Sequence, residues 1–378
     1  MAGERLIVNV HRDPRYRGNG EVTIRPSAFH RTMPEYAVTP VIDLSGLAAT
    51  CGVARIAVKN EQQRLGLPSF KALGSSWALH ERVRASKDPA RTLIPFPDLR
   101  SLVQGLGPPT LCTASDGNHG RAVAALAEAL GCGCVVFLPA DSAAARVEAI
   151  ASHGADVKLV DGSYDDAVAA ARAAARAQAH WYCPDTVGDA ADDEERAFAS
   201  NVMMGYATLF EELFGQLGRV PDVLFVQAGV GGLSAAGVSV VRRSSARTKV
   251  VVVEPQGSDA IARSIAVGSP IAVADVPTVM ACLRCQSVSA VAWPILRVGI
   301  DAVLVVADDE AAAAMRELAR AGIVAGASGA AGLAGALVAC ADERQRAQLG
   351  ITPTSTIAVV NTEGATDPAS YESIVASK

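Results

Sequence analysis

The feature that most constrains the fold is a repeated alternation between short apolar runs and longer helical segments. Residues 250–253 are four consecutive valines, and similar runs of Val, Ile and Leu recur along the chain. Continuous apolar runs are typical of strands buried on both faces, whereas a half-exposed strand alternates polar and apolar side chains. Buried strands that alternate with helices predict an α/β fold built from parallel sheets.

Two interruptions divide this alternation, a Pro-rich stretch at 88–109 and an acidic stretch at 189–195. We therefore predict two parallel-sheet domains, with residues 88–190 inserted as the smaller one into a larger one made of residues 1–87 and 191–378. Residues 1–36 lack periodicity and predict an irregular arm. A single helix is expected over residues 196–214. Strands are expected at residues 56–58, 110–114, 134–138, 157–160, 223–226, 250–253, 302–306 and 356–360.

Composition excludes several classes of partner. Half of the 378 residues are hydrophobic, 19% are charged and the net charge is -5, so the chain has no basic footprint for nucleic acid. No stretch has the length and apolarity of a transmembrane helix, and charged residues around Leu6 leave no signal-peptide core. We expect a cytoplasmic protein that binds small molecules and neither nucleic acid nor a membrane.

The eight cysteines are expected to be reduced thiols, because they are scattered in a long chain without an export signal. Cys282 and Cys285 have the spacing of zinc ligands. No second pair of ligands accompanies them, so no metal site is predicted.

Lys71 is unusual because it stands where a helix is expected to begin, after Pro68 and the potential cap Ser69. A lysine near the positive end of a helix and partly removed from water has a destabilised ammonium form. Such a lysine suits Schiff-base or nucleophilic chemistry. The alternative is a surface lysine whose aliphatic stem covers Phe70.

A glycine loop between an apolar run and a helix predicts an anion site, because it presents backbone N–H groups at a helix N-terminus. Two other interpretations stay open. Gly229, Gly231 and Ser234 nearly match the dinucleotide fingerprint, and Glu254 follows the next strand where a ribose partner would lie. The loop could also be a plain turn. Its residues are Gly229, Val230, Gly231, Gly232 and Leu233.

A second polar loop follows the strand at 110–114, where open α/β sheets bind ligands. Ser115, Asp116 and Asn118 could hold a carboxylate or a phenolic oxygen, and Asp116 could move a proton. Ser115 or Asn118 could instead simply cap the next helix. His119 is equally compatible with packing at the helix start and with acid or base chemistry.

The lysine motif, the polar loop and the glycine loop, in this order and separation, resemble the pyridoxal-phosphate enzymes of the tryptophan-synthase β fold (fold type II). The resemblance covers about residues 28–375. In particular the chain resembles the diaminopropionate ammonia-lyases, which is suggested by Asp116, by Asp185 followed by Thr186, and by residues 203–209, 292–297 and 362–368.

The resemblance implies pyridoxal 5'-phosphate as cofactor and elimination of ammonia from 2,3-diaminopropionate, giving pyruvate and ammonia. Residues 1–87 and 191–378 would bind the cofactor, and the protein would be a homodimer with a small-molecule amino-acid substrate. Roles carried over to single residues are Schiff-base lysine for Lys71, a bond to the cofactor's 3-oxygen for Asn118, and phosphate binding for Gly229, Val230, Gly231, Gly232 and Leu233. Thr362 would lie near the pyridine nitrogen, Ser115 would bind substrate, and Asp116 and Asp185 would flank the substrate as acid or base.

Some positions depart from the pattern of these relatives. Cys282 stands where they usually have glycine, Gln286 and Ser287 replace another pair, and Ala365 replaces an acid. These departures leave open a dehydratase or a β-replacement enzyme acting on another β-substituted amino acid. The alternative of another class is an NAD(P)-dependent oxidoreductase, based on the glycine loop.

Overall fold

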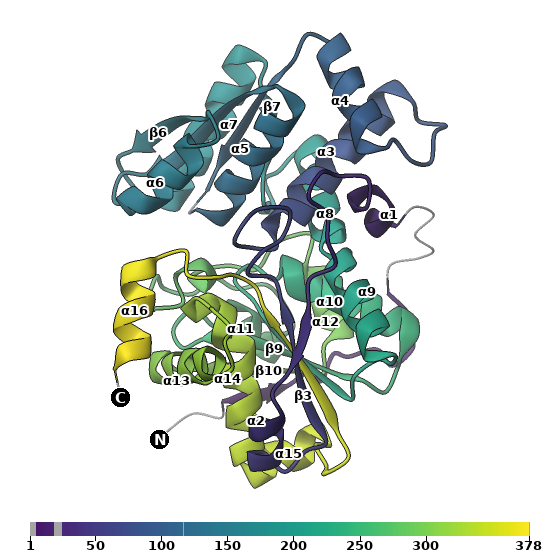
Figure 1. The fold of residues 1–378 in the computed structure, drawn as a ribbon, viewed down its shortest axis with the longest axis vertical. Helices are drawn as coiled ribbons and strands as arrows, with labels where there is room; N and C mark the ends of the chain where they lie inside the picture. The colour runs from purple at the N-terminus through teal and green to yellow at the C-terminus, as the bar shows by residue number, and fades with distance from the viewer. Residues whose placement is uncertain (1–4, 19–24, 116, 378) are drawn as a thin grey trace. The chain divides into compact units, whose positions relative to one another are not determined.

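A computed structural model describes residues 5–18, 25–115 and 117–377. They form two compact units (Figure 1). Unit 1 contains the described residues of 1–21, 38–63 and 209–378, and unit 2 contains those of 22–37 and 64–208. By packing, residues 64–87 and 191–208 therefore belong with 88–190, whereas the sequence-based division groups them with the larger domain. The functional division of the chain stays a prediction.

Unit 1 is built on a seven-stranded sheet. Its strands are β1 (Leu6–Val8), β2 (Val41–Asp43), β3 (Arg55–Asn60), β8 (Val223–Gln227), β9 (Lys249–Pro255), β10 (Ala302–Val306) and β11 (Thr356–Asn361). They lie in the order β1-β10-β9-β8-β11-β3-β2. The five inner strands are parallel, as predicted, and only the edge strands β1 and β2 pair antiparallel with their neighbours. The expected irregular arm thus contributes β1, which pairs with β10.

Helices bury both faces of this sheet. Residues of β8 and β9 that point to one face, such as Phe225 and Val253, belong to a core that includes the helices α13 (Asp308–Arg320) and α14 (Ala327–Ala341). The alternate residues Leu224 and Val252 are also fully buried, which explains the uninterrupted apolar runs. The other helices of unit 1 are α2 (Ser45–Thr50), α10 (Gly232–Ser244), α11 (Ala260–Val267), the 3-10 turn η1 (Ala281–Leu283), α12 (Trp293–Gly299), α15 (Glu343–Leu349) and α16 (Pro368–Ala376).

Unit 2 contains a four-stranded, fully parallel sheet in the order β6-β5-β4-β7. Its strands are β4 (Thr110–Ala114), β5 (Gly133–Pro139), β6 (Asp156–Val160) and β7 (Trp181–Tyr182). The helices are α1 (Pro26–His30), α3 (Lys71–Lys87), α4 (Phe96–Gly105), α5 (Asn118–Leu130), α6 (Ala144–Ala151), α7 (Tyr164–Gln178) and α8 (Asp193–Gly205). Both α5 and α7 pack on the sheet, and α3 packs on α5 and α8 (Figure 1).

Two local expectations were wrong. The single helix expected over 196–214 is divided into α8 and α9 (Ala207–Leu217). The Tyr206 N–H donates to the Met203 oxygen, three residues back, at 3.3 Å, so the last turn of α8 tightens instead of continuing. The Pro-rich stretch expected to be irregular contains α4, whose first turn includes Pro97, where a missing N–H leaves no helical bond unmade.

Within the described ranges, no helix combines the length and the apolarity that crossing a membrane requires.

Candidate active site

Lys71 is the first residue of α3, and its ammonium group forms an ion pair with the carboxylate of Asp185. Ser69 was expected to cap this helix, but the cap position is taken by Phe70 and no side chain caps it. The aromatic rings of Phe70 and Tyr206 have their centroids 5.5 Å and 5.9 Å from the Lys71 Nζ. The lysine side chain is 21% exposed, so its amine is partly desolvated and held beside an acid.

Asp185 has two further polar neighbours. The Tyr206 hydroxyl donates to its Oδ1 at 3.1 Å, and the His119 Nδ1 lies 3.4 Å from the same oxygen. Burial alone would raise the pKa of the Asp185 carboxyl, but the charges of Lys71 and His119 outweigh it and lower that pKa to about 2. Asp185 is therefore an anion at neutral pH. We call Lys71, His119, Asp185 and Tyr206 the lysine cluster.

Two neighbouring strands of the sheet in unit 2 position this cluster. Asp185 follows β7, and His119 lies in the first turn of α5, which follows β4. The Thr113 hydroxyl donates to the Cys183 oxygen at 2.8 Å, and the His119 Nε2 lies 2.9 Å from that oxygen. The cluster thus lies at the carboxyl ends of parallel strands, where ligands bind in open α/β sheets.

In the loop between β4 and α5, the predicted site residue Ser115 stabilises the start of the helix. The Ser115 Oγ accepts the N–H groups of Gly117 at 2.9 Å and Gly120 at 2.8 Å, so Ser115 caps α5. Asn118 is the first residue of that helix and is half-buried. Asp116 lies outside the described residues. The functional roles of these three residues stay predictions.

In unit 1 the glycine loop joins β8 to α10. Gly231, at the cap of α10, has a φ of +97°, which favours glycine. A Cβ on Gly229 would lie 2.8 Å from the Cys285 Sγ, and one on Gly231 would lie 2.6 Å from the Leu296 Cδ1. Because the first N–H groups of a helix have no intrahelical acceptor, the loop and α10 offer backbone donors to an anion.

Thr362 directly follows β11, which is the neighbour of β8 in the sheet. Its Oγ1 accepts a hydrogen bond from the Gln227 Nε2 at 3.1 Å, and both residues are buried. Roles for Gln227 and Tyr206 were not predicted from the sequence. Gln227 could have been identified from the sequence, because it is a polar residue at the end of an apolar strand and precedes the glycine loop.

Glu254 has a structural role that removes the main support for a dinucleotide site. Its two carboxylate oxygens accept the N–H groups of Ile261 at 2.9 Å and Ala262 at 2.8 Å. The side chain is fully buried, and burial raises its pKa to about 8. Glu254 thus caps α11 and is not presented to a ribose.

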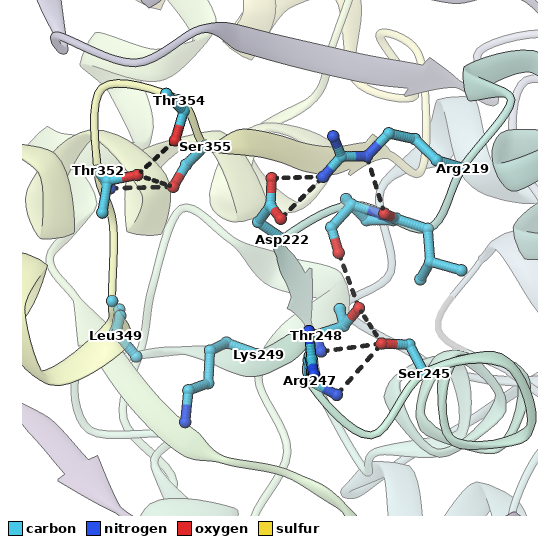
Figure 2. Close-up of a pocket in the computed structure, with 13 residues that line it drawn as sticks. Arg219, Asp222, Ser245, Arg247, Thr248, Lys249, Leu349, Thr352, Thr354 and Ser355 are labelled. Atoms are coloured by element: carbon cyan, nitrogen blue, oxygen red, sulfur yellow. Dashed lines mark hydrogen bonds and ion pairs between the residues drawn. The ribbon is translucent and has the colours of Figure 1, made fainter.

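A cavity of unit 1 lies at the amino ends of β8 and β9, whereas the glycine loop follows the carboxyl end of β8 (Figure 2). Asp222, which precedes β8, and Lys249, which begins β9, both line it. Arg219 also lines the cavity and donates twice to Asp222, each time at 2.8 Å (Figure 2). Because parallel sheets bind ligands at their carboxyl ends, we do not assign this cavity to the active site.

Residues 32–363 match the family model described as "Pyridoxal-phosphate dependent enzyme". The chain therefore belongs to the pyridoxal-phosphate dependent enzymes. It is 33% identical to diaminopropionate ammonia-lyase of Salmonella typhimurium strain LT2, covering 94% of this chain and 92% of that protein. It is 34% identical to diaminopropionate ammonia-lyase of Escherichia coli strain K12, covering 92% and 89%.

Solved structures agree with this assignment. The E. coli diaminopropionate ammonia lyase in complex with an aminoacrylate-PLP azomethine reaction intermediate superposes with a TM-score of 0.83 at 28% identity. The match covers 98% of this chain and 96% of that chain. The predicted family, the fold type II architecture and the cofactor are thus confirmed.

The described residues fit pyridoxal phosphate. The glycine loop leaves no space for side chains at Gly229 and Gly231 and offers backbone donors suited to a phosphate. Lys71 is a partly buried primary amine and Thr362 is a buried hydroxyl, the groups that the cofactor's aldehyde and ring nitrogen would require. Among the described residues, no group of three or more His, Cys, Asp or Glu side chains could hold a metal ion.

Proposed function

We propose that this enzyme is a diaminopropionate ammonia-lyase. The reaction converts 2,3-diaminopropionate and one water into pyruvate and two molecules of ammonia. The observation that carries the proposal is the anionic carboxylate of Asp185 beside the Lys71 amine. A carboxylate held at this point by three polar neighbours suits a substrate whose β-substituent is a cation.

The residues that resemble the family's cofactor-binding motifs would hold the cofactor. The Lys71 amine would bind its aldehyde carbon, Asn118 its 3-oxygen and Thr362 its ring nitrogen. The phosphate would be bound by Gly229, Val230, Gly231, Gly232 and Leu233. When bound, pyridoxal phosphate stabilises the negative charge that develops at Cα of an amino-acid substrate.

The protein's own side chains would supply substrate selectivity and proton transfer. With the Lys71 amine engaged, Asp185 exchanges its lysine partner for the β-ammonium group of the substrate. Tyr206 and His119 keep the carboxylate oriented through their contacts with its Oδ1. Lys71, once the substrate's amino group has released it from the cofactor, would accept the Cα proton of one enantiomer, Asp116 would accept that of the other, and Ser115 would contribute to substrate binding.

The likeness to diaminopropionate ammonia-lyases over nearly the whole chain supports elimination of an amine. A second candidate, elimination or replacement at another β-substituted amino acid, is favoured by one local feature. The Cys282 Sγ is 3.5 Å from the Glu363 Oε2, at a position where the resemblance to these enzymes would predict glycine. A side chain there changes the surroundings of the glycine loop.

The decisive assay is pyruvate release from both enantiomers of 2,3-diaminopropionate, compared with serine and threonine. We expect diaminopropionate to have the highest kcat/KM. Preferred turnover of serine or threonine would establish the dehydratase instead, and an adduct formed from added sulfide would establish β-replacement. Borohydride reduction of the loaded enzyme should add the cofactor's mass at Lys71, and Lys71→Ala should abolish both this mass and turnover.

Asp185→Asn tests the selectivity residue. We expect kcat/KM for diaminopropionate to fall by about 10- to 100-fold relative to that for serine, since a charge-assisted contact is lost. Asp189→Asn is the matched control, because Asp189 is exposed four residues further along the same segment. Equal losses on both substrates would contradict selectivity by Asp185.

Finally, we propose that the enzyme acts as a cytoplasmic homodimer. The eight cysteines, none of which forms a disulfide in the part of the chain that the structure describes, support a reducing compartment. The dimer rests on the resemblance to fold type II enzymes. Light scattering coupled to size-exclusion chromatography measures it directly: the mass should be twice that of the 38.9 kDa chain.

A further inference from the structure

Gln227 makes an unusual set of contacts directly ahead of the glycine loop. It is 1% exposed, and its Nε2 is 3.0 Å from each of three carbonyl oxygens, those of Ser328, Gly329 and Val360. The same nitrogen is 3.1 Å from the Thr362 Oγ1. Because carbonyl oxygens can only accept, these neighbours fix which end of the amide carries the nitrogen.

The other end of the amide shows that this orientation is costly. The Gln227 Oε1 is buried and has no hydrogen-bond partner among the described residues. It lies against Gly332 of α14, where an added Cβ would be 2.9 Å from it. A buried acceptor without a donor destabilises a fold. In this orientation the amide oxygen of Gln227 makes no hydrogen bond, whereas its amide nitrogen donates.

The consequence falls on the proton of Thr362. An amide nitrogen cannot accept a hydrogen bond, so the Thr362 Oγ1 must be the acceptor in this pair. The Thr362 hydroxyl proton is then free to donate in another direction. No second partner for that hydroxyl occurs among the described residues.

We propose that Gln227 is a positioning residue that makes Thr362 the hydrogen-bond donor to the pyridine nitrogen of the cofactor. This inference rests on the proposed function, which assigns Thr362 to that nitrogen. A donor hydroxyl leaves the ring nitrogen hydrogen-bonded but without a full positive charge. Gln227 thereby sets the electronic state of the cofactor without touching it.

The test compares binding of pyridoxal phosphate with binding of its 1-deaza analogue, in which a C–H group replaces the ring nitrogen. Wild-type protein should bind pyridoxal phosphate about tenfold more tightly than the analogue, the value of one hydrogen bond. Gln227→Met and Thr362→Val should each weaken binding of pyridoxal phosphate by about that factor and leave binding of the analogue unchanged. The double variant should lose no more than either single variant, because both remove the same interaction.

Two further variants separate positioning from packing. Gln227→Glu removes the amide nitrogen that makes Thr362 the acceptor and should shift the absorption maximum of the bound cofactor. Thr362→Ser keeps the hydroxyl and should retain wild-type discrimination between the two ligands. If Gln227→Met is too unstable to purify, Gln227→Glu still tests the positioning role, with Thr362→Val and Thr362→Ser as references.

Equal weakening of both ligands in Gln227→Met would overturn the proposal, because it would reveal a purely structural role. Equal binding of the two ligands by wild-type protein would overturn it as well. Failure of the proposed function is distinguishable, since it would appear as preferred turnover of serine or threonine over diaminopropionate and would leave the comparison of the two ligands unchanged.

Discussion

Lys71 and Asp185 form an ion pair although 114 residues separate them in the chain. The helix α3 also packs on α5, whose first turn contains His119, the other side chain that lowers the pKa of Asp185. The lysine thus has a dedicated counter-ion within its own unit. This arrangement makes the ionisation of Asp185 measurable through protein stability.

Stability of the protein freed of cofactor should depend on Asp185 in acid. Its folded-state pKa of about 2 is below the ordinary value of 3.8, so its contribution is present above pH 3.8 and is lost as pH falls toward 2. Asp185→Asn should lower the free energy of unfolding by about 2 kcal/mol at pH 6. In urea titrations between pH 3 and 6, the gap between the two proteins should narrow below about pH 4. A gap that is constant with pH would contradict this.

Tyr206→Phe should remove one hydrogen bond and keep the ring. The ring of Tyr206 packs on Phe70 with 4.7 Å between centroids, and phenylalanine preserves that contact. Burial raises the pKa of Tyr206, so the hydroxyl stays protonated and donates to Asp185. We expect unfolding free energy to fall by about 1 kcal/mol and KM for diaminopropionate to rise. Tyr371→Phe, in α16, is the control and should change neither quantity.

Gly231→Ala should abolish tight cofactor binding. Its φ of +97° is unfavourable for alanine, and the new Cβ would be 2.6 Å from the Leu296 Cδ1. We expect destabilisation of about 1 to 3 kcal/mol and at least a tenfold weaker affinity for pyridoxal phosphate in an absorbance titration. Gly215→Ala in α9 meets nothing within 4 Å and should instead stabilise the protein slightly. Unchanged affinity in Gly231→Ala would exclude a close backbone contact with the phosphate.

Cys51 should react with iodoacetamide at a lower pH than Cys132. The hydrogen bond from Cys340 lowers the pKa of Cys51 to about 7, whereas burial raises that of the half-buried Cys132 to about 11. Alkylation followed by mass spectrometry should be half-maximal near pH 7 at Cys51 and should require alkaline pH at Cys132. Cys340→Ala should move the Cys51 midpoint toward 9. An unmoved midpoint would show that another group lowers the Cys51 pKa.

Local patterns allowed much of the fold and part of the site to be predicted. Lys71 at a helix start and the strand-glycine-helix order at Gly231 are both properties of a few adjacent residues. The contacts of Gln227 with Thr362, 135 residues away, depend instead on β8 and β11 being neighbours in the sheet. The role of Tyr206 could not be predicted either, because it also depends on contacts that are distant in the sequence. Its importance arises from a helix break and from its contact with Asp185, which no periodicity encodes.

The prediction of an irregular arm at the N-terminus was wrong about β1, again because the pairing partner is distant in the sequence. Three residues give too little pattern to identify a strand, and the partner of Leu6 is Leu304, 298 residues further along the chain.

The two antiparallel edge strands also bear on how the protein avoids aggregation. Each is only three residues long, yet β1 covers β10 and β2 covers β3. A long parallel strand with a free edge is a template onto which another molecule can add its own strand. These short strands leave little unpaired backbone at either margin of the sheet. Removing the first ten residues would uncover β10 and convert that margin into a surface for intermolecular strand addition.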